Sequence, residues 1–124
     1  MFMRNAWYVA AWGTEIDDTP LARTLLGEPV VLYRTDDGAA VALEDRCCHR
    51  HLPLSLGRVV GNEIECGYHG LKFDVTGACT LVPGQTQVPP GATIRGYRLI
   101  ERWGLAWIWM GDPELADEGL IPDW

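Results

Sequence analysis

The chain has 124 residues, of which 48% are hydrophobic and 22% are charged, and this composition predicts one globular domain with a core of its own. A formal net charge of −7, with no basic stripe in the sequence, argues against a nucleic-acid partner. No stretch reaches the roughly 18 apolar residues of a membrane span, and the opening MFMRNAWYVAAWGTE is too short for a signal peptide. We therefore expect a cytoplasmic protein with reduced thiols and with no nucleic-acid or membrane partner.

Short strands separated by turns are predicted along most of the chain, because β-branched and aromatic runs are interrupted by turn-forming residues. The predicted strands are residues 21–26, 29–34, 39–44, 59–60, 63–65, 71–73, 98–103 and 105–110. Turns lie between them, as at Asp37-Gly38, where the Asp-Gly pair is suited to positive φ. The proline-dense run 82–91 is predicted to be a loop. No segment keeps a helical period over roughly 11 to 18 residues, so residues 1–124 are predicted to form a single all-β domain of small antiparallel sheets.

Two short cysteine–histidine motifs are the most informative feature of the sequence. Cys47 and His49 form a C-x-H motif, and Cys66 and His69 form a C-x-x-H motif further along the chain. Each pair follows a predicted strand, so we expect both pairs on hairpin-like loops that a rigid sheet holds in place. In a reducing compartment, such thiols and imidazoles are more typical of a metal site than of disulfide bonds.

Two kinds of metal centre fit these four ligands. A structural zinc site can be Cys2His2, but zinc modules usually pair cysteine with cysteine and histidine with histidine. A [2Fe–2S] cluster can instead take two cysteines on one iron and two histidines on the other, which raises its reduction potential. The mixed motifs favour the cluster, with Cys47 and Cys66 on one iron and His49 and His69 on the other. A structural zinc-binding module without a redox role is the alternative from another class.

Other residues near the motifs also carry predictions. Three glycines are expected where the backbone approaches inorganic sulfide; they are Gly57, Gly67 and Gly70. Cys79 is predicted to be a buried small hydrophobic residue, and Trp103, Trp107 and Trp109 are predicted to pack in the core. A solvated basic rim, rather than a docking patch, is predicted beside the motifs; its members are Arg46, Arg50, Arg58 and Lys72.

The stretches CCHRHLPLSLGRV and IECGYHGLKFD resemble the Rieske signature of non-haem iron oxygenases, which usually reads C-P-H-R-x-x-P-L-S and then C-x-Y-H-G. The similarity extends over nearly the whole chain. RNAWYVAAW, PLARTLLGEPVVLYR, LVPGQ and the closing WIWMGDPELAD with IPDW resemble the N-terminal Rieske domain of the vanillate O-demethylase and dicamba monooxygenase group. Respiratory Rieske proteins carry an extra cysteine in each ligand loop. Leu52 and Tyr68 stand at those places here, so the resemblance implies no such disulfide.

A few positions beside the motif bear on this resemblance. Cys48 stands where the family usually has proline, which removes a rigid residue and adds an oxidisable thiol. His51 stands where the family usually has another residue, and we expect it on the loop surface rather than on the cluster. Pro83 and Gly84 resemble the loop that covers the cluster in Rieske proteins, although an ordinary surface loop fits these two residues equally well.

The resemblance implies an oxidoreductase role in electron transfer. In this family the Rieske domain takes electrons from a reductase or ferredoxin and passes them to a mononuclear non-haem Fe(II) in a C-terminal catalytic domain. That iron activates dioxygen for hydroxylation or O-demethylation of aromatic compounds, and the subunits commonly form a homotrimer. All three histidines of this chain lie between residues 49 and 69, so we expect the catalytic domain to be absent from residues 1–124. A stand-alone Rieske ferredoxin is the alternative of similar fold, and the closing segment, which resembles a lead-in to another domain, favours the oxygenase module.

Overall fold

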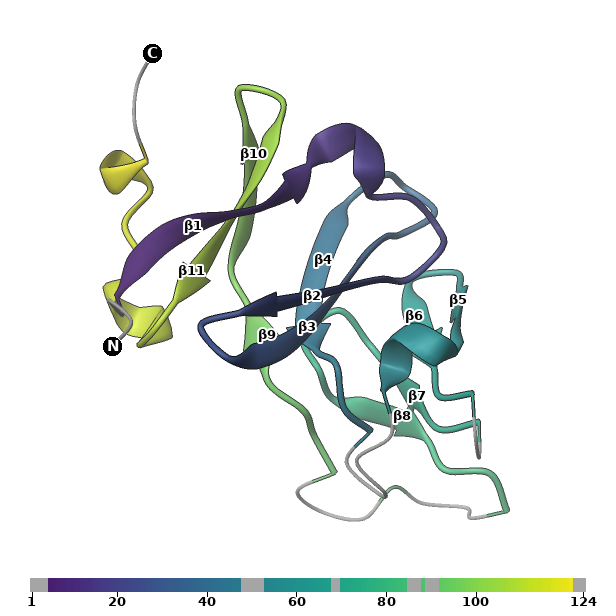
Figure 1. The fold of residues 1–124 in the computed structure, drawn as a ribbon. Helices are drawn as coiled ribbons and strands as arrows, with labels where there is room; N and C mark the ends of the chain where they lie inside the picture. The colour runs from purple at the N-terminus through teal and green to yellow at the C-terminus, as the bar shows by residue number, and fades with distance from the viewer. Residues whose placement is uncertain (1–4, 48–52, 68–69, 85–87, 89–91, 122–124) are drawn as a thin grey trace.

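The computed structural model describes residues 5–47, 53–67, 70–84, 88 and 92–121. Within these residues the chain forms three antiparallel sheets, and the middle sheet lies between the other two (Figure 1). The first sheet, in the order β1–β11–β10, contains β1 (Ala6–Trp12), β11 (Leu105–Met110) and β10 (Leu99–Arg102). The middle sheet contains β2 (Leu21–Leu25), β3 (Glu28–Arg34), β4 (Ala40–Glu44) and β9 (Gly96–Tyr97). The small sheet contains β5 (Arg58–Val60), β6 (Glu63–Glu65), β7 (Lys72–Phe73) and β8 (Cys79–Leu81).

The helical segments of the described residues are short 3-10 turns. They are η1 (Gly13–Glu15), η2 (Leu54–Leu56), η3 (Pro113–Leu115) and η4 (Glu118–Leu120). Nothing helical in this part of the chain has the length and apolar character needed to cross a bilayer. The prediction of an all-β fold is confirmed.

The middle sheet is covered on both faces, which explains why β3 carries an almost unbroken apolar run instead of a simple alternation. Val30 and Leu32 point toward the first sheet, whereas Val31 and Tyr33 point toward the small sheet. The first core contains Ala10, Ala11, Ile16, Val30, Leu32, Ala42, Ala106, Ile108 and Met110. The second core contains Val31, Tyr33, Val41, Leu43, Cys47, Leu54, Ile64, Cys66, Leu71, Phe73, Cys79 and Ile94. The domain is therefore built from two cores that share the middle sheet.

All the predicted strands are present, and β6 and β11 have the predicted ends, whereas the others differ at one or both ends. Two bulky residues predicted in strands lie in turns instead. Leu26 has a φ of 51° and precedes Gly27, and Trp103 has a φ of 62° and precedes Gly104. Two consecutive positive φ angles between paired strands are the mark of a type I′ turn. The prediction that Trp103 packs in the core is therefore wrong, because the turn leaves it 45% exposed, whereas Trp107 and Trp109 are buried as predicted.

Strand β1 was not among the predicted strands, and it completes the first sheet by pairing with β11. Its Trp7 lies opposite Trp109, and the two rings meet edge to face with centroids 5.3 Å apart. Trp7 Nε1 also donates to the Asp117 carbonyl at 2.7 Å, which attaches the segment after β11 to this sheet. Strands β8 (three residues) and β9 (two residues) were also not predicted.

The Arg34 side chain joins the middle sheet to the first sheet. Its Nε donates to the Ile16 carbonyl at 2.8 Å, Nη1 donates to the Gly38 carbonyl at 3.0 Å, and Nη2 donates to the Gly13 carbonyl at 2.8 Å. Nη1 also donates to Glu101 Oε2 at 3.0 Å, and Nη2 pairs with Glu101 Oε1. All five N–H groups of the guanidinium therefore have an acceptor.

The Arg34–Glu101 pair predicts a pH dependence of folding stability. The hydrogen bond from Arg34 holds the pKa of Glu101 below its usual value, against the opposing effect of burial. A carboxyl group with a lowered pKa in the folded state stabilises the fold fully above its unfolded pKa of about 4.3, and this stabilisation is lost as the pH falls through the lower folded value. Glu101→Gln should thus be less stable than wild type at pH 7, and the difference should shrink below about pH 4. Urea unfolding between pH 3 and pH 7 measures the difference in unfolding free energy between the variant and wild type. A difference that stays constant with pH would contradict the stabilising role of the ionised Glu101 carboxylate.

Candidate metal centre

The two motif cysteines come together in the second core. Cys47 lies shortly after the end of β4, and Cys66 directly follows β6. Both are reduced, and their exposed fractions are only 2% and 3%. Leu54 and Phe73, both fully buried, belong to the same core. The thiols from two separate loops are therefore held on one apolar floor between the middle sheet and the small sheet.

The two ligand loops differ in topology. The second loop, between β6 and β7, lies within an antiparallel pair and is a hairpin, as predicted. It is closed by the Cys66 N–H, which donates to the Leu71 carbonyl at 2.7 Å, and by the Gly70 N–H, which donates to the Cys66 carbonyl at 3.1 Å. The first loop instead leads from β4 in the middle sheet to η2 and β5, so it crosses between two sheets. The position of Cys47 therefore depends on how the small sheet is attached to the rest of the domain.

Tyr33 helps to attach the small sheet. This side chain is fully buried, and its hydroxyl donates to the Asn62 carbonyl in the β5–β6 turn at 3.1 Å. Burial, reinforced by Asp74 and then Glu63, raises the pKa of Tyr33 well above its ordinary value. The hydroxyl is therefore protonated at neutral pH and can donate this hydrogen bond.

Two glycines allow the backbones of the two ligand loops to touch. A Cβ added to Gly57, just after η2, would lie 1.8 Å from the Glu65 carbonyl oxygen and 3.0 Å from the Gly67 nitrogen. A Cβ added to Gly67 would lie 2.8 Å from the Leu56 carbonyl oxygen. The sequence predicted glycine here for close approach to sulfide, but in the described residues the neighbour is the other loop. The backbones at Gly57 and Gly67 thus lie too close to their neighbours to leave room for a side chain.

The third predicted glycine, Gly70, has a φ of 76°, so it lies in the left-handed region that favours glycine. A Cβ at Gly70 would lie 3.3 Å from Pro83 Cγ. Pro83 therefore packs against the second ligand loop, as the predicted covering loop would. The described residues of the run 82–91 lie outside strands, in agreement with the loop prediction.

Both predicted histidine ligands lie outside the described residues. Five other residues that carry predictions also lie outside the described residues, namely Cys48, Arg50, His51, Leu52 and Tyr68. Among the residues that are described, no three His, Cys, Asp or Glu side chains gather closely enough to hold a metal ion. The described half of the predicted site is the thiol pair, Cys47 and Cys66.

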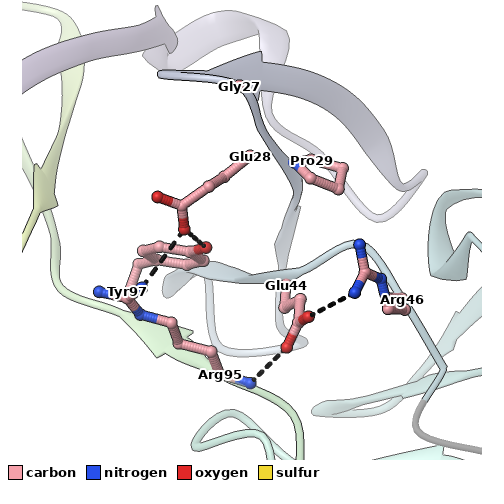
Figure 2. A pocket seen from close by; sticks show the side chains of 7 residues that line it. All are labelled: Gly27, Glu28, Pro29, Glu44, Arg46, Arg95 and Tyr97. Atoms are coloured by element: carbon pink, nitrogen blue, oxygen red, sulfur yellow. Dashed lines mark hydrogen bonds and ion pairs between the residues drawn. The ribbon is translucent and has the colours of Figure 1, made fainter. Parts of the chain in front are cut away.

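A hollow of about 240 Å³ lies beside the start of the first ligand loop (Figure 2). Arg95 pairs there with Glu28 at 3.3 Å and stacks over the Tyr97 ring at 5.0 Å, and the Tyr97 hydroxyl donates to Glu28 Oε1 at 2.9 Å. Burial, and then Glu28, raise the pKa of Tyr97 above its ordinary value, so it remains a donor. Glu44 accepts a hydrogen bond from the Arg95 backbone N–H at 3.1 Å and lies 3.9 Å from Arg46 (Figure 2). Two carboxylates thus balance two guanidinium groups in this hollow, and Arg46 is the one member of the predicted rim that lines it.

Cys79 behaves as a small hydrophobic residue, as predicted. It is buried in the second core, and its Sγ lies 3.5 Å from the Leu81 carbonyl. Burial raises the pKa of this thiol, so it is neutral and unreactive at neutral pH.

Two residues outside the ligand motifs, Asp45 and Ser55, join the ends of the first ligand loop. Neither was singled out from the sequence. The Asp45 carboxylate is buried and accepts two hydrogen bonds from Ser55. An acidic residue that directly follows a buried strand and precedes a motif cysteine was a signal in the sequence, because such a charge needs a partner.

The donor set fits an iron–sulfur cluster. Reduced cysteines on two loops supply thiolates, which are the ligands that Fe–S clusters take. Both cysteines are buried among the apolar side chains of the second core, which shields them from water. His49 and His69 follow Cys47 and Cys66 by two and three residues in the sequence. The fold and site therefore define a small all-β domain with an iron–sulfur centre between two loops.

Comparisons with known proteins give this class a name. Residues 6–97 match the family model described as Rieske [2Fe-2S] domain. The chain is 56% identical over 125 residues to the toluene-4-sulfonate monooxygenase system iron–sulfur subunit of Comamonas testosteroni, covering 100% of this chain and 36% of that protein. It is 50% identical over 123 residues to the dicamba O-demethylase oxygenase component of Stenotrophomonas maltophilia, covering 98% and 36%. The crystal structure of apo dicamba monooxygenase superposes with a TM-score of 0.95 at 49% identity, covering 98% of this chain and 38% of that one.

The chain belongs to the Rieske [2Fe–2S] domain family. It corresponds to the Rieske part of oxidoreductase components and spans about 36% of the length of the two relatives above. The predictions of family, of fold, of a [2Fe–2S] cofactor and of a Rieske electron-transfer function are confirmed. The zinc-binding alternative is set aside by the same match.

Proposed function

We propose that Cys47, His49, Cys66 and His69 bind a Rieske [2Fe–2S] cluster, which the domain uses to carry electrons within an oxygenase component. The observation that carries this proposal is the meeting of Cys47 and Cys66 in one core, on loops whose backbones touch. The family match, over residues 6–97, includes all four positions.

The residues of the chain have separate tasks in this proposal. When bound, the cluster supplies one-electron chemistry at a potential raised by its histidine ligands. Cys47 and Cys66 hold one iron as thiolates on the buried side, and His49 and His69 hold the other as neutral imidazoles. The second core keeps the thiolate side dry, and Gly57 and Gly67 set the spacing of the loops.

The relatives support a larger role. Their names describe a toluene-4-sulfonate monooxygenase system and a dicamba O-demethylase, each with an iron–sulfur or oxygenase component. We propose that this chain likewise receives electrons from a reductase or ferredoxin and delivers them to a mononuclear non-haem iron in a C-terminal catalytic domain outside residues 1–124. The substrate class is an aromatic compound, the assembly a homotrimer, and the compartment the cytoplasm.

Visible absorption and EPR of the purified chain test the proposed cluster. A red-brown protein that becomes EPR-active on reduction with dithionite, with two irons and two sulfides per chain, is expected. A colourless chain that binds zinc instead would contradict the proposal.

His69→Cys tests the ligand assignment. A third thiolate makes the cluster one unit more negative, so the cluster should persist with a midpoint potential lower by on the order of 100 mV. His51→Gln is the matched control, because His51 is adjacent to the motif but is not an expected ligand, and it should keep the wild-type potential. A His69→Cys chain with an unchanged potential would show that His69 is not a ligand.

A further inference from the structure

Asp45 and Ser55 join the two ends of the first ligand loop. Asp45 Oδ1 accepts a hydrogen bond from the Ser55 backbone N–H at 2.7 Å, and Asp45 Oδ2 accepts one from Ser55 Oγ at 2.7 Å. Because both carboxylate oxygens bind the same residue, the contact fixes the orientation of the two ends as well as their separation. Residues 46–54 lie between them and include two proposed ligands, Cys47 and His49.

The burial of Asp45 sets this contact apart from an ordinary turn. The residue is 7% exposed, and among the described residues its carboxylate forms no ion pair. Removing a carboxylate from water costs several kcal/mol unless strong hydrogen bonds offset the loss. Asp74 closes the β7–β8 turn with the same chemistry, accepting from Thr76 N at 2.9 Å and Thr76 Oγ1 at 2.6 Å, but it is only partly buried. A buried charge is therefore not needed just to close a turn.

Both ends of the loop are themselves fixed to the domain. The Asp45 N–H donates to the Pro29 carbonyl at the start of β3 at 3.0 Å. On the other side, Leu54 is fully buried in the second core, and its carbonyl accepts from the Gly57 N–H at 2.9 Å. The Asp45–Ser55 contact thus connects two anchored points and fixes the distance between the two ends of the first ligand loop.

We propose that Asp45 and Ser55 form a positioning pair, which holds residues 46–54 in the cluster-binding conformation, slows cluster loss and adjusts the reduction potential. This inference rests on the proposed function, because it takes Cys47 and His49 as ligands. Loss of the pair leaves the three sheets paired but frees the two ends of the first ligand loop from each other, and the cluster is then lost more quickly. The Cα atoms of Asp45 and Cys47 are within about 7 Å of each other, because only one residue separates them, and the nearby negative charge of Asp45 disfavours reduction of the cluster.

Hydrogen exchange of the iron-free chain tests the positioning role without any cluster. In Asp45→Asn and in Ser55→Ala, amides of residues 46–57 should exchange about tenfold or more faster than in wild type, because a charge-assisted hydrogen bond is lost. Ser55→Thr keeps both donors and should retain the wild-type rate. Asp74→Asn is the matched control, and it should accelerate exchange only in the β7–β8 turn. Wild-type exchange across residues 46–57 in Asp45→Asn and Ser55→Ala would overturn the proposal.

The cluster-loaded chain gives the second readout. Asp45→Asn and Ser55→Ala should each lose iron to a chelator about tenfold faster than wild type, and Asp45→Asn should have a higher midpoint potential, whereas Asp74→Asn should match wild type in both. Wild-type iron loss in both loop variants, or a wild-type potential in Asp45→Asn, would overturn the proposal. If the wild-type chain holds no cluster at all, the proposed function fails, and the exchange measurement still decides whether the pair orders the loop.

Discussion

Replacing Gly57 with alanine should destabilise the domain by about 3 kcal/mol or more and abolish cluster binding. The added Cβ would lie 1.8 Å from the Glu65 carbonyl oxygen, and no side chain can move aside because the obstacle is backbone. The two ligand loops must separate, which moves Cys47 and Cys66 apart. Thermal unfolding and iron content of the purified variant measure both effects.

Gly61→Ala is the matched control for this prediction. Gly61 lies in the β5–β6 turn with a φ of 63°, and a Cβ there would meet only Asp36 Oδ2 at 3.7 Å. The cost should be about 1–2 kcal/mol, from the left-handed conformation alone, with the iron content unchanged. A Gly57→Ala chain that is as stable as Gly61→Ala and keeps its iron would show that the loops do not depend on the close contact.

Arg34→Met should lower the free energy of unfolding by about 3 kcal/mol and the Tm by about 10 °C. The substitution keeps most of the apolar stem but removes all the donors to Gly13, Ile16, Gly38 and Glu101. Glu101 is 39% exposed and water can take over much of its pairing, so most of the loss comes from the three carbonyl groups. Differential scanning calorimetry gives the Tm.

Arg23→Met provides the comparison for Arg34. Arg23 pairs with Glu15 at 2.9 Å, and the two side chains are 33% and 40% exposed. An exposed pair of this kind contributes about 0–1 kcal/mol, so the Tm should change by only a few degrees. Equal losses in the two variants would contradict the view that the carbonyl contacts of Arg34 account for most of its contribution to stability.

Local sequence patterns predicted the hairpins well where the turn chemistry was ordinary. The β5–β6 hairpin is an example, because Gly61-Asn62 separates two short β-branched runs and the strands end where predicted. Leu26 and Trp103 could not be predicted as turn residues, since bulky residues rarely take positive φ. The strands on either side of each turn are paired in a sheet, and this pairing stabilises the positive φ that the residue alone would disfavour. Strand β9 is too short to leave any periodic pattern, and its pairing with β4 is a long-range contact.

The cluster motif was readable from the sequence because ligand chemistry restricts both residue type and spacing. The close approach was not predicted, because the distance from Gly57 to the Glu65 carbonyl is set by how the chain continues beyond the paired ends of the β5–β6 hairpin, which the turn residues do not indicate. For the same reason the sequence suggested sulfide as the neighbour of Gly57. The Asp45–Ser55 contact shows a similar limit, since the burial of Asp45 becomes evident only when η2 is placed beside the end of β4.

The central claim is that two histidines and two cysteines share one cluster, and pulsed EPR on the dithionite-reduced chain tests it most directly. The chain has three histidines, so labelling histidine with a nitrogen isotope marks only His49, His51 and His69. We predict hyperfine coupling to two histidine nitrogens that changes on labelling, is retained in His51→Gln and falls to one nitrogen in His69→Cys. A reduced spectrum that does not change on labelling would contradict the account.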